Sequence, residues 1–319
     1  MRQYLELIQD VIGNGEWTEN RTGIRTKMLP GAMLRFDLRK GFPAVTTKKL
    51  AFKSVVGELC AFLRASTSAA DFRALGCKVW DQNANENQAW LNNPFREGTD
   101  DLGPVYGAQW RNWQAYKEVS TDQQLDSAGA AGWSEYIVGV SQNGRRLMHK
   151  EIDQLGDCVR TIINNPDSRR ILFHGWNPAD LDAVALPACH LLYQFMPNPN
   201  TGLLHMNLFL RSNDLFLGAP FNIAEGAVLL SLIARLTGYT PGVFNYFIGD
   251  AHVYENHFDM VHTQLQREPY ALPTLVIDAR VPFGAEAEEA VEWLAKVEPS
   301  DFTLVNYVHH EPIKAEMAV

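Results

Sequence analysis

The chain has 319 residues, of which 46% are hydrophobic and 20% are charged. This composition excludes a disordered, collagen-like or disulfide-stapled protein, because it supplies enough apolar side chains for a large core. The 28 Lys and Arg residues against 37 Asp and Glu residues give a net charge of −9. Such a chain offers no general basic surface for DNA or a membrane, so an anionic ligand would need a local group of arginines.

The cysteines and the amino terminus indicate a cytoplasmic protein. Cys60, Cys77, Cys158 and Cys189 lie far apart without a CxxC pair, which argues against a metal site or a disulfide framework. Reduced thiols are typical of the cytoplasm. The first 15 residues carry acidic side chains within their apolar stretch, unlike a signal peptide. No apolar run reaches the roughly 18 residues of a membrane span.

The first part of the chain predicts two helices separated by extended segments. Apolar residues recur at helical spacing over residues 4–12, and the pattern ends at Gly13. A second helical pattern covers residues 50–63. Residues 33–38 and 42–47 have the composition of short strands or extended segments.

The second half of the chain is richer in predicted strands. A helix is expected over residues 223–236, ending at Gly238. Strands and helices mix without a regular βαβ rhythm, so we predict an α+β fold, layered, with a large mixed β-sheet flanked by helices. The predicted strands are residues 170–176, 190–196, 203–211, 243–249 and 274–278.

Two polar stretches interrupt these patterns. Residues 82–100 are rich in Asn, and residues 114–144 are rich in Ser, Gly, Gln and Asp with little periodicity. No repeat and no long linker divides the chain. We therefore expect one domain over residues 1–319, with both stretches as surface insertions.

One predicted hairpin brings a thiol to a guanidinium. The strand after Cys189 and the strand ending at Arg211 are joined by PNPNTG (197–202), which favours antiparallel pairing. With the turn centred near Asn200, paired residue numbers sum to about 400, and Cys189 falls opposite Arg211. A guanidinium there favours the nucleophilic thiolate. The alternative is that Cys189 is merely a small buried hydrophobe.

Further polar residues suggest an anion and a base. Arg169 and Arg170 add positive charge that suits a phosphate, or form only a solvated surface pair. Ser212, Asn213 and Asp214 precede an apolar loop and are expected to face a ligand or each other. Asn222 either caps a helix or pairs with a base edge that carries one carbonyl and one N–H.

Motifs along the whole chain resemble those of the thymidylate synthases. They cover most of the sequence outside the two insertions. The matching segments are ENRTGIRT (19–26), GFPAVTTKKL (41–50), GEL with Phe62 and Leu63 (57–63), VWD (79–81), DLGPVYGAQWRNW (101–113), DSRRI (167–171), ALPACH (185–190), RSNDLFLGAPFNIA (211–224), GDAHVYENH (249–257), QLQREP (264–269) and IKAEMAV (313–319).

The resemblance implies reductive methylation of dUMP to dTMP. The co-substrate 5,10-methylenetetrahydrofolate would supply the carbon and the hydride and leave as dihydrofolate, with no metal. Cys189 would be the nucleophile that adds to C6 of the uracil. The fold would form a homodimer through its sheet, because Arg169 and Arg170 would reach the phosphate of the other subunit.

The resemblance also implies roles for individual side chains. Arg21, Arg211 and Ser212 would hold the phosphate. Asn222 would read the uracil, and His252 with Tyr254 would hold the ribose hydroxyl. The full dUMP set is Arg21, Arg169, Arg170, His190, Arg211, Ser212, Asn213, Asp214, Asn222, His252 and Tyr254.

Proton transfer and folate binding complete the implied site. Glu58 would organise water at the base and Tyr106 would help remove the C5 proton, although periodicity alone also allows a solvent-facing Glu58. The tail, residues 315–319, would close over the site. The catalytic set is Cys189, Glu58, Tyr106, Arg211, Asp214 and Asn222; the folate set is Glu58, Trp80, Leu186, Asp214, Gly218, Phe221 and Ala318.

Some positions depart from the family pattern. Ala188 stands where many relatives have proline, Asn83 where a tryptophan is frequent, Leu210 where a glutamine is usual, and Glu225 where a serine is usual. Two other functions start from the same site. One is a pyrimidine hydroxymethylase, in which water traps the methylene, and the other is a silent nucleotide-binding dimer.

Overall fold

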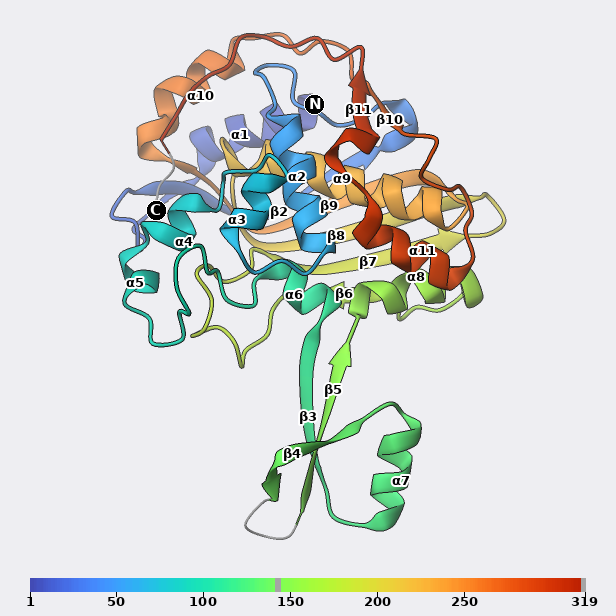
Figure 1. Cartoon of the computed structure of the whole chain (residues 1–319). Helices are drawn as coiled ribbons and strands as arrows, with labels where there is room; N and C mark the ends of the chain where they lie inside the picture. The colour runs from blue at the N-terminus through green and yellow to red at the C-terminus, as the bar shows by residue number, and fades with distance from the viewer. Residues whose placement is uncertain (141–144, 317–319) are drawn as a thin grey trace.

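A large mixed β-sheet forms the centre of the protein (Figure 1). The computed structural model describes residues 1–140 and 145–316. In this part of the chain the sheet has the strand order β1-β2-β9-β8-β7-β6, with β8 and β9 parallel and the other pairs antiparallel. The strands are β1 (Glu16–Thr18), β2 (Thr26–Asp37), β6 (Leu172–His174), β7 (His190–Asn198), β8 (Leu203–Asp214) and β9 (Thr240–Tyr254).

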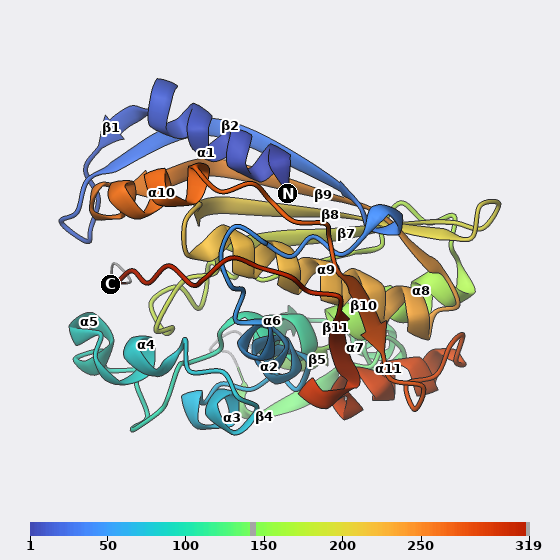
Figure 2. The ribbon, with the colours of Figure 1, turned by 90° about the horizontal axis from the view of Figure 1, so that it is seen from above.

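Helices flank this sheet, so the predicted large mixed sheet with flanking helices is confirmed. Helix α9 (Gly218–Leu236) packs on β8 and β9, and α2 (Phe52–Leu63) packs on the far side of α9 (Figure 2). Further helices and short strands of the body are α1 (Arg2–Asn14), α3 (Ala69–Ala74), α6 (Tyr106–Arg111), α8 (Gln154–Asn164), α10 (Phe258–Leu265), α11 (Ala287–Lys296), the 3-10 helices Leu38–Lys40, Glu255–His257 and Pro299–Asp301, β10 (Thr274–Ile277) and β11 (Phe302–Val305).

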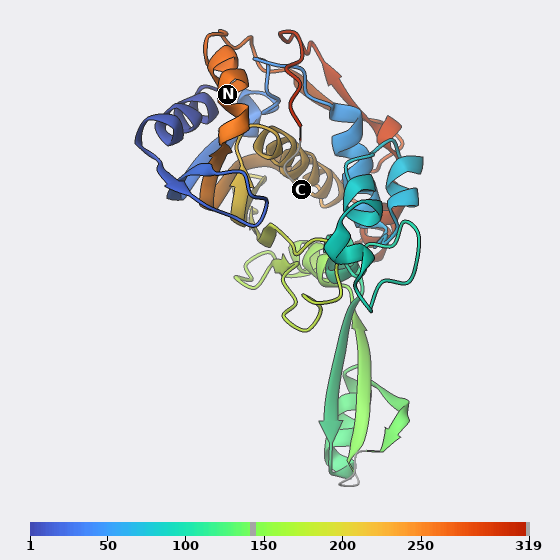
Figure 3. The same cartoon turned by 90° about the vertical axis from the view of Figure 1, so that its left-hand side faces the viewer.

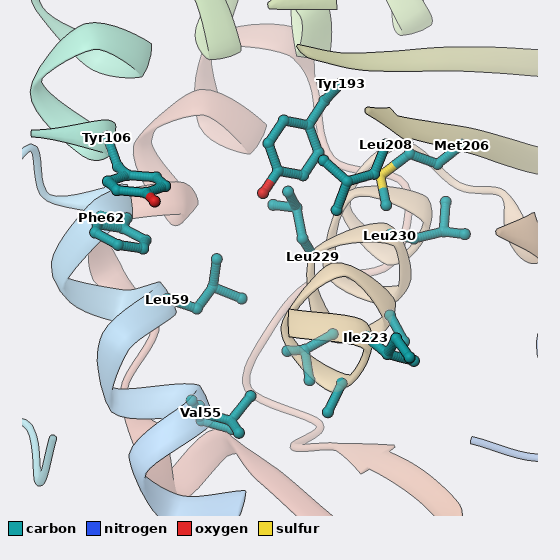
Figure 4. Close-up of a cluster of buried hydrophobic side chains, with 14 of the residues drawn as sticks. Val55, Leu59, Phe62, Tyr106, Tyr193, Met206, Leu208, Ile223, Leu229 and Leu230 are labelled. Carbon is teal, nitrogen blue, oxygen red and sulfur yellow. The ribbon is translucent and has the colours of Figure 1, made fainter. Parts of the chain in front are cut away.

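The layers meet in one apolar core (Figure 4). Alternate residues of β8, such as Leu208, point toward α9, while Leu229 of α9 and Leu59 of α2 fill the space between the layers. Helix α9 is apolar on nearly all sides because it has protein on nearly all sides. Among the described residues it is also long and apolar enough to span a membrane, but 83% of that window is buried within the protein.

The other residues of β8 and β9 form an outer sheet face, made of His205, Asn207, Phe209, Asn245 and Phe247. These side chains alternate with the core residues and are partly exposed. The rings of Phe209 and Phe247 stack with centroids 4.6 Å apart. Asn245 Nδ2 donates to Asn207 Oδ1, whereas Asn245 Oδ1 is buried without a hydrogen-bond partner.

The second predicted insertion forms an arm that projects from the body (Figures 1 and 3). Its three-stranded sheet has the order β3-β5-β4 and carries α7. Val119, Ala128 and Met148 make a small core of its own. Partly buried and exposed residues alternate over 113–119, a pattern typical of a strand that was not recognised in the sequence. The elements are β3 (Trp113–Val119), α7 (Asp122–Ala130), β4 (Ser134–Val140) and β5 (Arg146–Ile152).

The first predicted insertion lies against the body. It contains two short helices, α4 (Asp81–Asn85) and α5 (Gln88–Leu91). Trp90 is buried and its Nε1–H donates to the carbonyl of Asp101 over 2.7 Å. Arg73 joins both ends of the segment through ion pairs with Asp81 and Asp100.

Several predicted boundaries were wrong. Of the two alternatives for residues 42–47, the strand is not formed and the segment is buried and irregular. Residues 243–249 are only the middle of the long β9. The predicted strand over 170–176 is limited to Leu172–His174. Helix α9 begins at Gly218 rather than Ile223, so Asn222 lies inside the helix and is not its N-cap.

The close packing of α2 gives a stability prediction. A Cβ on Gly57 would lie 2.4 Å from the backbone oxygen of Leu75, which cannot rotate away. Gly57→Ala should therefore lower the free energy of unfolding by about 1–3 kcal/mol. No atom lies within 4 Å of the position that a Cβ would take on Gly13, at the end of α1. Gly13→Ala should therefore leave the free energy of unfolding unchanged or raise it by up to about 1 kcal/mol. Denaturant unfolding of both variants tests this, and equal stabilities would contradict it.

Candidate active site

A cavity of about 840 Å³ opens where β8 and β9 end, beside α2 and the start of α9. Its wall is built from segments far apart in sequence, and it collects most of the residues that the sequence analysis selected. The predicted residues on this wall are Arg21, Glu58, Trp80, Tyr106, Leu186, Cys189, His190, Arg211, Ser212, Asn213, Asp214, Gly218, Phe221, Asn222, His252 and Tyr254.

The thiol and guanidinium meet as the hairpin geometry predicts. His190 pairs with Leu210, while Leu192 pairs with Phe209, so the strand β7 bulges at Leu191. Beyond the last pair, the Arg211 N–H donates to the Cys189 carbonyl over 3.0 Å. Arg211 Nη2 lies 3.5 Å from Cys189 Sγ. The half-buried thiol thus faces the cavity with the positive charge of Arg211 beside it.

The guanidinium is held in place by backbone oxygens. Arg211 Nε donates to the Ala188 carbonyl over 2.9 Å, and Nη2 donates to the Pro187 carbonyl over 3.1 Å. These bonds leave other N–H groups of Arg211 for a ligand, because a guanidinium has five donors.

Two aromatic groups stand behind the thiol. The hydroxyl of Tyr106 accepts the N–H of Cys189 over 2.8 Å, and burial raises the pKa of Tyr106 well above its ordinary value. His190 is fully buried, and its Nδ1 lies 2.8 Å from the hydroxyl of Tyr193. Burial lowers the pKa of His190 to about 4, so the imidazole is neutral at physiological pH.

Glu58 is buried rather than solvent-facing, which overturns the alternative from periodicity. The residue is 6% exposed on α2, and Trp80 Nε1–H donates to its Oε1 over 2.6 Å. Burial raises the pKa of Glu58, while hydrogen bonds with Trp80 and Glu225 act in the opposite direction. A carboxyl group in such a setting exchanges its proton closer to neutral pH than an exposed one.

A chain of hydrogen bonds orients Asn222. The Tyr246 hydroxyl donates to Asn213 Oδ1 over 2.7 Å, and Asn213 Nδ2 donates to Asn222 Oδ1 over 2.9 Å. A Cβ on Gly218 would lie 3.3 Å from Asn213 Nδ2, so the residue's small size leaves room for this amide pair. The Asn222 amide is therefore held at the cavity wall in a fixed orientation.

The parallel pairing of β8 and β9 gathers the remaining polar groups. Ser212 pairs with Asp250 and Asp214 pairs with His252. Asp214 Oδ1 accepts the backbone N–H of Phe216 over 2.8 Å, which turns the chain into α9. His252 Nδ1 lies 3.0 Å from Asp250 Oδ1.

Two predicted site residues lie away from the cavity, and a third is outside the described residues. Arg169 and Arg170 are exposed in the loop between α8 and β6, and neither lines the cavity. Ala318 lies outside the described residues. Arg21 does line the cavity, on the exposed loop between β1 and β2.

The cavity also contains residues that the sequence analysis did not select. Lys48 and Asp250 contribute charges and Ile313 brings the C-terminal segment to the wall. Burial lowers the pKa of Lys48 to about 8, and its Nζ donates to the carbonyl of Phe216. Lys48 lies in segment 41–50, which resembles the family, and this resemblance is the sequence signal that could have identified it as a site residue. Asn83 lines the cavity as well.

Comparisons with known proteins identify the family of this chain. The model of a family described as thymidylate synthase matches residues 2–319. The chain belongs to the thymidylate synthase family. It is 60% identical to a thymidylate synthase of Pseudomonas putida, 59% to one of Bordetella parapertussis and 57% to one of Pseudomonas syringae pv. tomato. Each comparison extends over 324 aligned residues and covers 100% of both chains.

The family fixes the class of reaction. Its members are methyltransferases that convert dUMP to dTMP, with methylenetetrahydrofolate as the co-substrate. Among the described residues, no group of three or more His, Cys, Asp or Glu side chains could hold a metal ion.

Proposed function

We propose that this chain methylates dUMP to dTMP in this cavity, with Cys189 as the nucleophile. The observation that carries the proposal is the convergence of Cys189, Arg211 and Asn222 on one cavity wall. Arg211, Ser212 and Arg21 hold the phosphate, His252 and Tyr254 hold the ribose, and Asn222 reads the uracil. His190, Asn213 and Asp214 support the nucleotide from behind.

The thiolate begins the reaction by forming a bond to C6 of the uracil. The electron pair of the C5–C6 bond moves toward C5 and the O4 carbonyl, so C5 becomes nucleophilic and attacks the folate methylene. Glu58 organises the water through which protons reach and leave the base, and Tyr106 helps remove the C5 proton. The C5–H bond then breaks, tetrahydrofolate leaves, and an exocyclic methylene remains on the base.

The product depends on excluding water at that stage. Hydride from the folate ring must reach the methylene before a hydroxide does, after which the Cys189 bond breaks and dTMP is released. Trp80, Leu186, Gly218 and Phe221 form an apolar folate wall, with Asp214 bonding the pterin and Asn83 beside it. The C-terminal segment runs along this site, where His257 Nε2 lies 2.8 Å from the carbonyl of Glu316. Ala318, the predicted folate contact of the tail, lies outside the described residues.

The active unit is a homodimer that pairs through the outer sheet face. The stacked Phe209 and Phe247 and the unpartnered Asn245 Oδ1 support this, because a partner would cover the apolar rings and the orphan oxygen. Arg169 and Arg170 then reach the phosphate of the other subunit's site. The chain is one domain of 1–319 and acts in the cytoplasm, where its four cysteines stay reduced.

Product analysis tests the proposed reaction. Purified protein mixed with dUMP and methylenetetrahydrofolate should give dTMP by mass spectrometry, with an equal amount of dihydrofolate by absorbance. Cys189→Ser should lose at least about a thousandfold in rate, because a hydroxyl cannot replace the thiolate, yet should still bind dUMP. A hydroxymethylated nucleotide with tetrahydrofolate would identify a hydroxymethylase instead, and substantial turnover by Cys189→Ser would remove Cys189 from its role.

Asn222→Asp tests which base is read. A carboxylate can accept a hydrogen bond from the amino group of cytosine, so the ratio of kcat/KM for dUMP over dCMP should fall by about 10- to 100-fold. Asn222→Ala is the matched control, since it removes the contact with uracil without adding one to cytosine. Unchanged discrimination in Asn222→Asp would show that another residue reads the base.

Mixed dimers test the contribution across the interface. Cys189→Ser and the double variant Arg169→Ala, Arg170→Ala should each be nearly inactive as homodimers. If the arginines act across the interface, half of randomly mixed dimers have one intact site, so co-expression should restore about one quarter of wild-type activity. If the co-expressed proteins are no more active than the two variants as homodimers, the arginines act in their own subunit's site or in neither site.

A further inference from the structure

Glu225 is a buried acid with no evident structural partner. It lies on α9, is 1% exposed, and neither carboxylate oxygen has a hydrogen-bond donor. It does not line the cavity. Its carboxyl group is instead within hydrogen-bonding reach of the Glu58 carboxyl on α2, provided that one of the two is protonated. An unpaired buried carboxylate would be very costly, so this contact calls for an explanation.

Two carboxyl groups in one apolar site cannot both be ionised. Mutual repulsion and burial force them to share a proton, and the pair then titrates as a unit. The contacts around the two acids are not symmetric. Glu58 receives the indole N–H of Trp80 over 2.6 Å, which stabilises its charge. Glu225 has no such donor, so the shared proton belongs on Glu225.

The groups facing this pair do not provide a counter-charge. His190 Nδ1 lies 3.7 Å from Glu225 Oε2, but burial keeps this histidine neutral, so no ion pair forms. The other groups around the pair are Cys77, Tyr106, Tyr193 and Tyr246, which are neutral at physiological pH because burial raises the pKa of each. Cys189 and Arg211 are beyond Tyr106, at the cavity. Burial raises the pKa of the Glu225 carboxyl well above its ordinary value.

We propose that Glu225 is a positioning residue: a neutral carboxylic acid whose O–H donates to the Glu58 carboxylate and sets the pH range in which Glu58 works. A carboxylic acid held neutral by an apolar site is a good donor. The inference rests on the proposed proton-transfer role of Glu58.

The direction of the effect follows from which form receives the hydrogen bond. A donor to Glu58 favours its ionised form and so opposes the effect of burial. Removing the donor should raise the pKa of Glu58, so the limb of the pH–rate profile that reports Glu58 moves to higher pH. An amide keeps an N–H donor but cannot ionise. Glu225→Gln should therefore behave like the native protein, whereas Glu225→Leu should not.

The kinetic experiment compares Glu225→Leu with Glu225→Gln, and includes Glu225→Ser. In Glu225→Leu the limb should move up by about one pH unit, which is a tenfold rate change on its slope. The KM for dUMP should stay within about threefold, because Glu225 does not line the cavity. Glu225→Gln should keep the native limb, whereas Glu225→Ser, whose hydroxyl is too short to reach Glu58, should move the limb as Glu225→Leu does. A merely structural role would change yield or melting temperature in all three without moving the limb.

An infrared measurement keeps the proposal testable without activity. Wild-type protein at pH 7 should show the C=O stretch of a buried protonated carboxyl, and in Glu225→Gln this band should be weaker, because only Glu58 can then contribute to it. Absence of this band in the wild type would overturn the proposal, as would equal pH limbs in Glu225→Leu and Glu225→Gln. The band does not depend on turnover, so its presence in an inactive protein would separate a failure of the proposed function from a failure of this inference.

Discussion

The antiparallel pairing of β7 with β8 is the constraint on which the site depends. Its bulge at Leu191 leaves Cys189 directly opposite Arg211, at the point where β7 begins and β8 approaches its end. The guanidinium is fixed by two backbone carbonyls, so the positive charge beside the thiol is preorganised rather than recruited on binding. Because β8 also runs parallel to β9, the same strand end carries polar groups from both strands into the cavity.

Local geometry explains why this hairpin could be predicted from sequence. A turn of known composition fixes the register of the strands beside it, and alternation then decides which side chains face the core. The start of α9 was missed because Gly218 and Pro220 are turn residues by composition, although proline is tolerated in a first helical turn. The arm was missed because its small core leaves most of its strand residues polar.

The rest of the site depends on tertiary packing that local patterns do not contain. Periodicity alone allowed a solvent-facing Glu58, because a lone acid on a helix is usually exposed, but α2 is covered on most sides by neighbouring layers. Asn222 was compatible with a cap or a base contact, and only the hydrogen bonds from Tyr246 through Asn213 show how its amide is oriented. Lys48 and Asp250 lie in matching segments, 41–50 and 249–257, but local periodicity does not place them on the wall, because the wall is built from segments far apart in sequence.

The buried acids connect this packing to chemistry. Helices α2 and α9 pack together through apolar side chains (Figure 4). Glu58 and Glu225 are buried on these two helices, in a low-dielectric setting that opposes charge. A single acid there would keep its proton to higher pH and would accept a proton less readily near neutral pH. A second acid that holds its own proton returns one hydrogen bond to the first, and so restores part of the ionised form. The apolar surroundings that keep water from the methylene thus also disfavour the ionised form of Glu58. The hydrogen bond from Glu225, on the facing helix α9, offsets part of that effect.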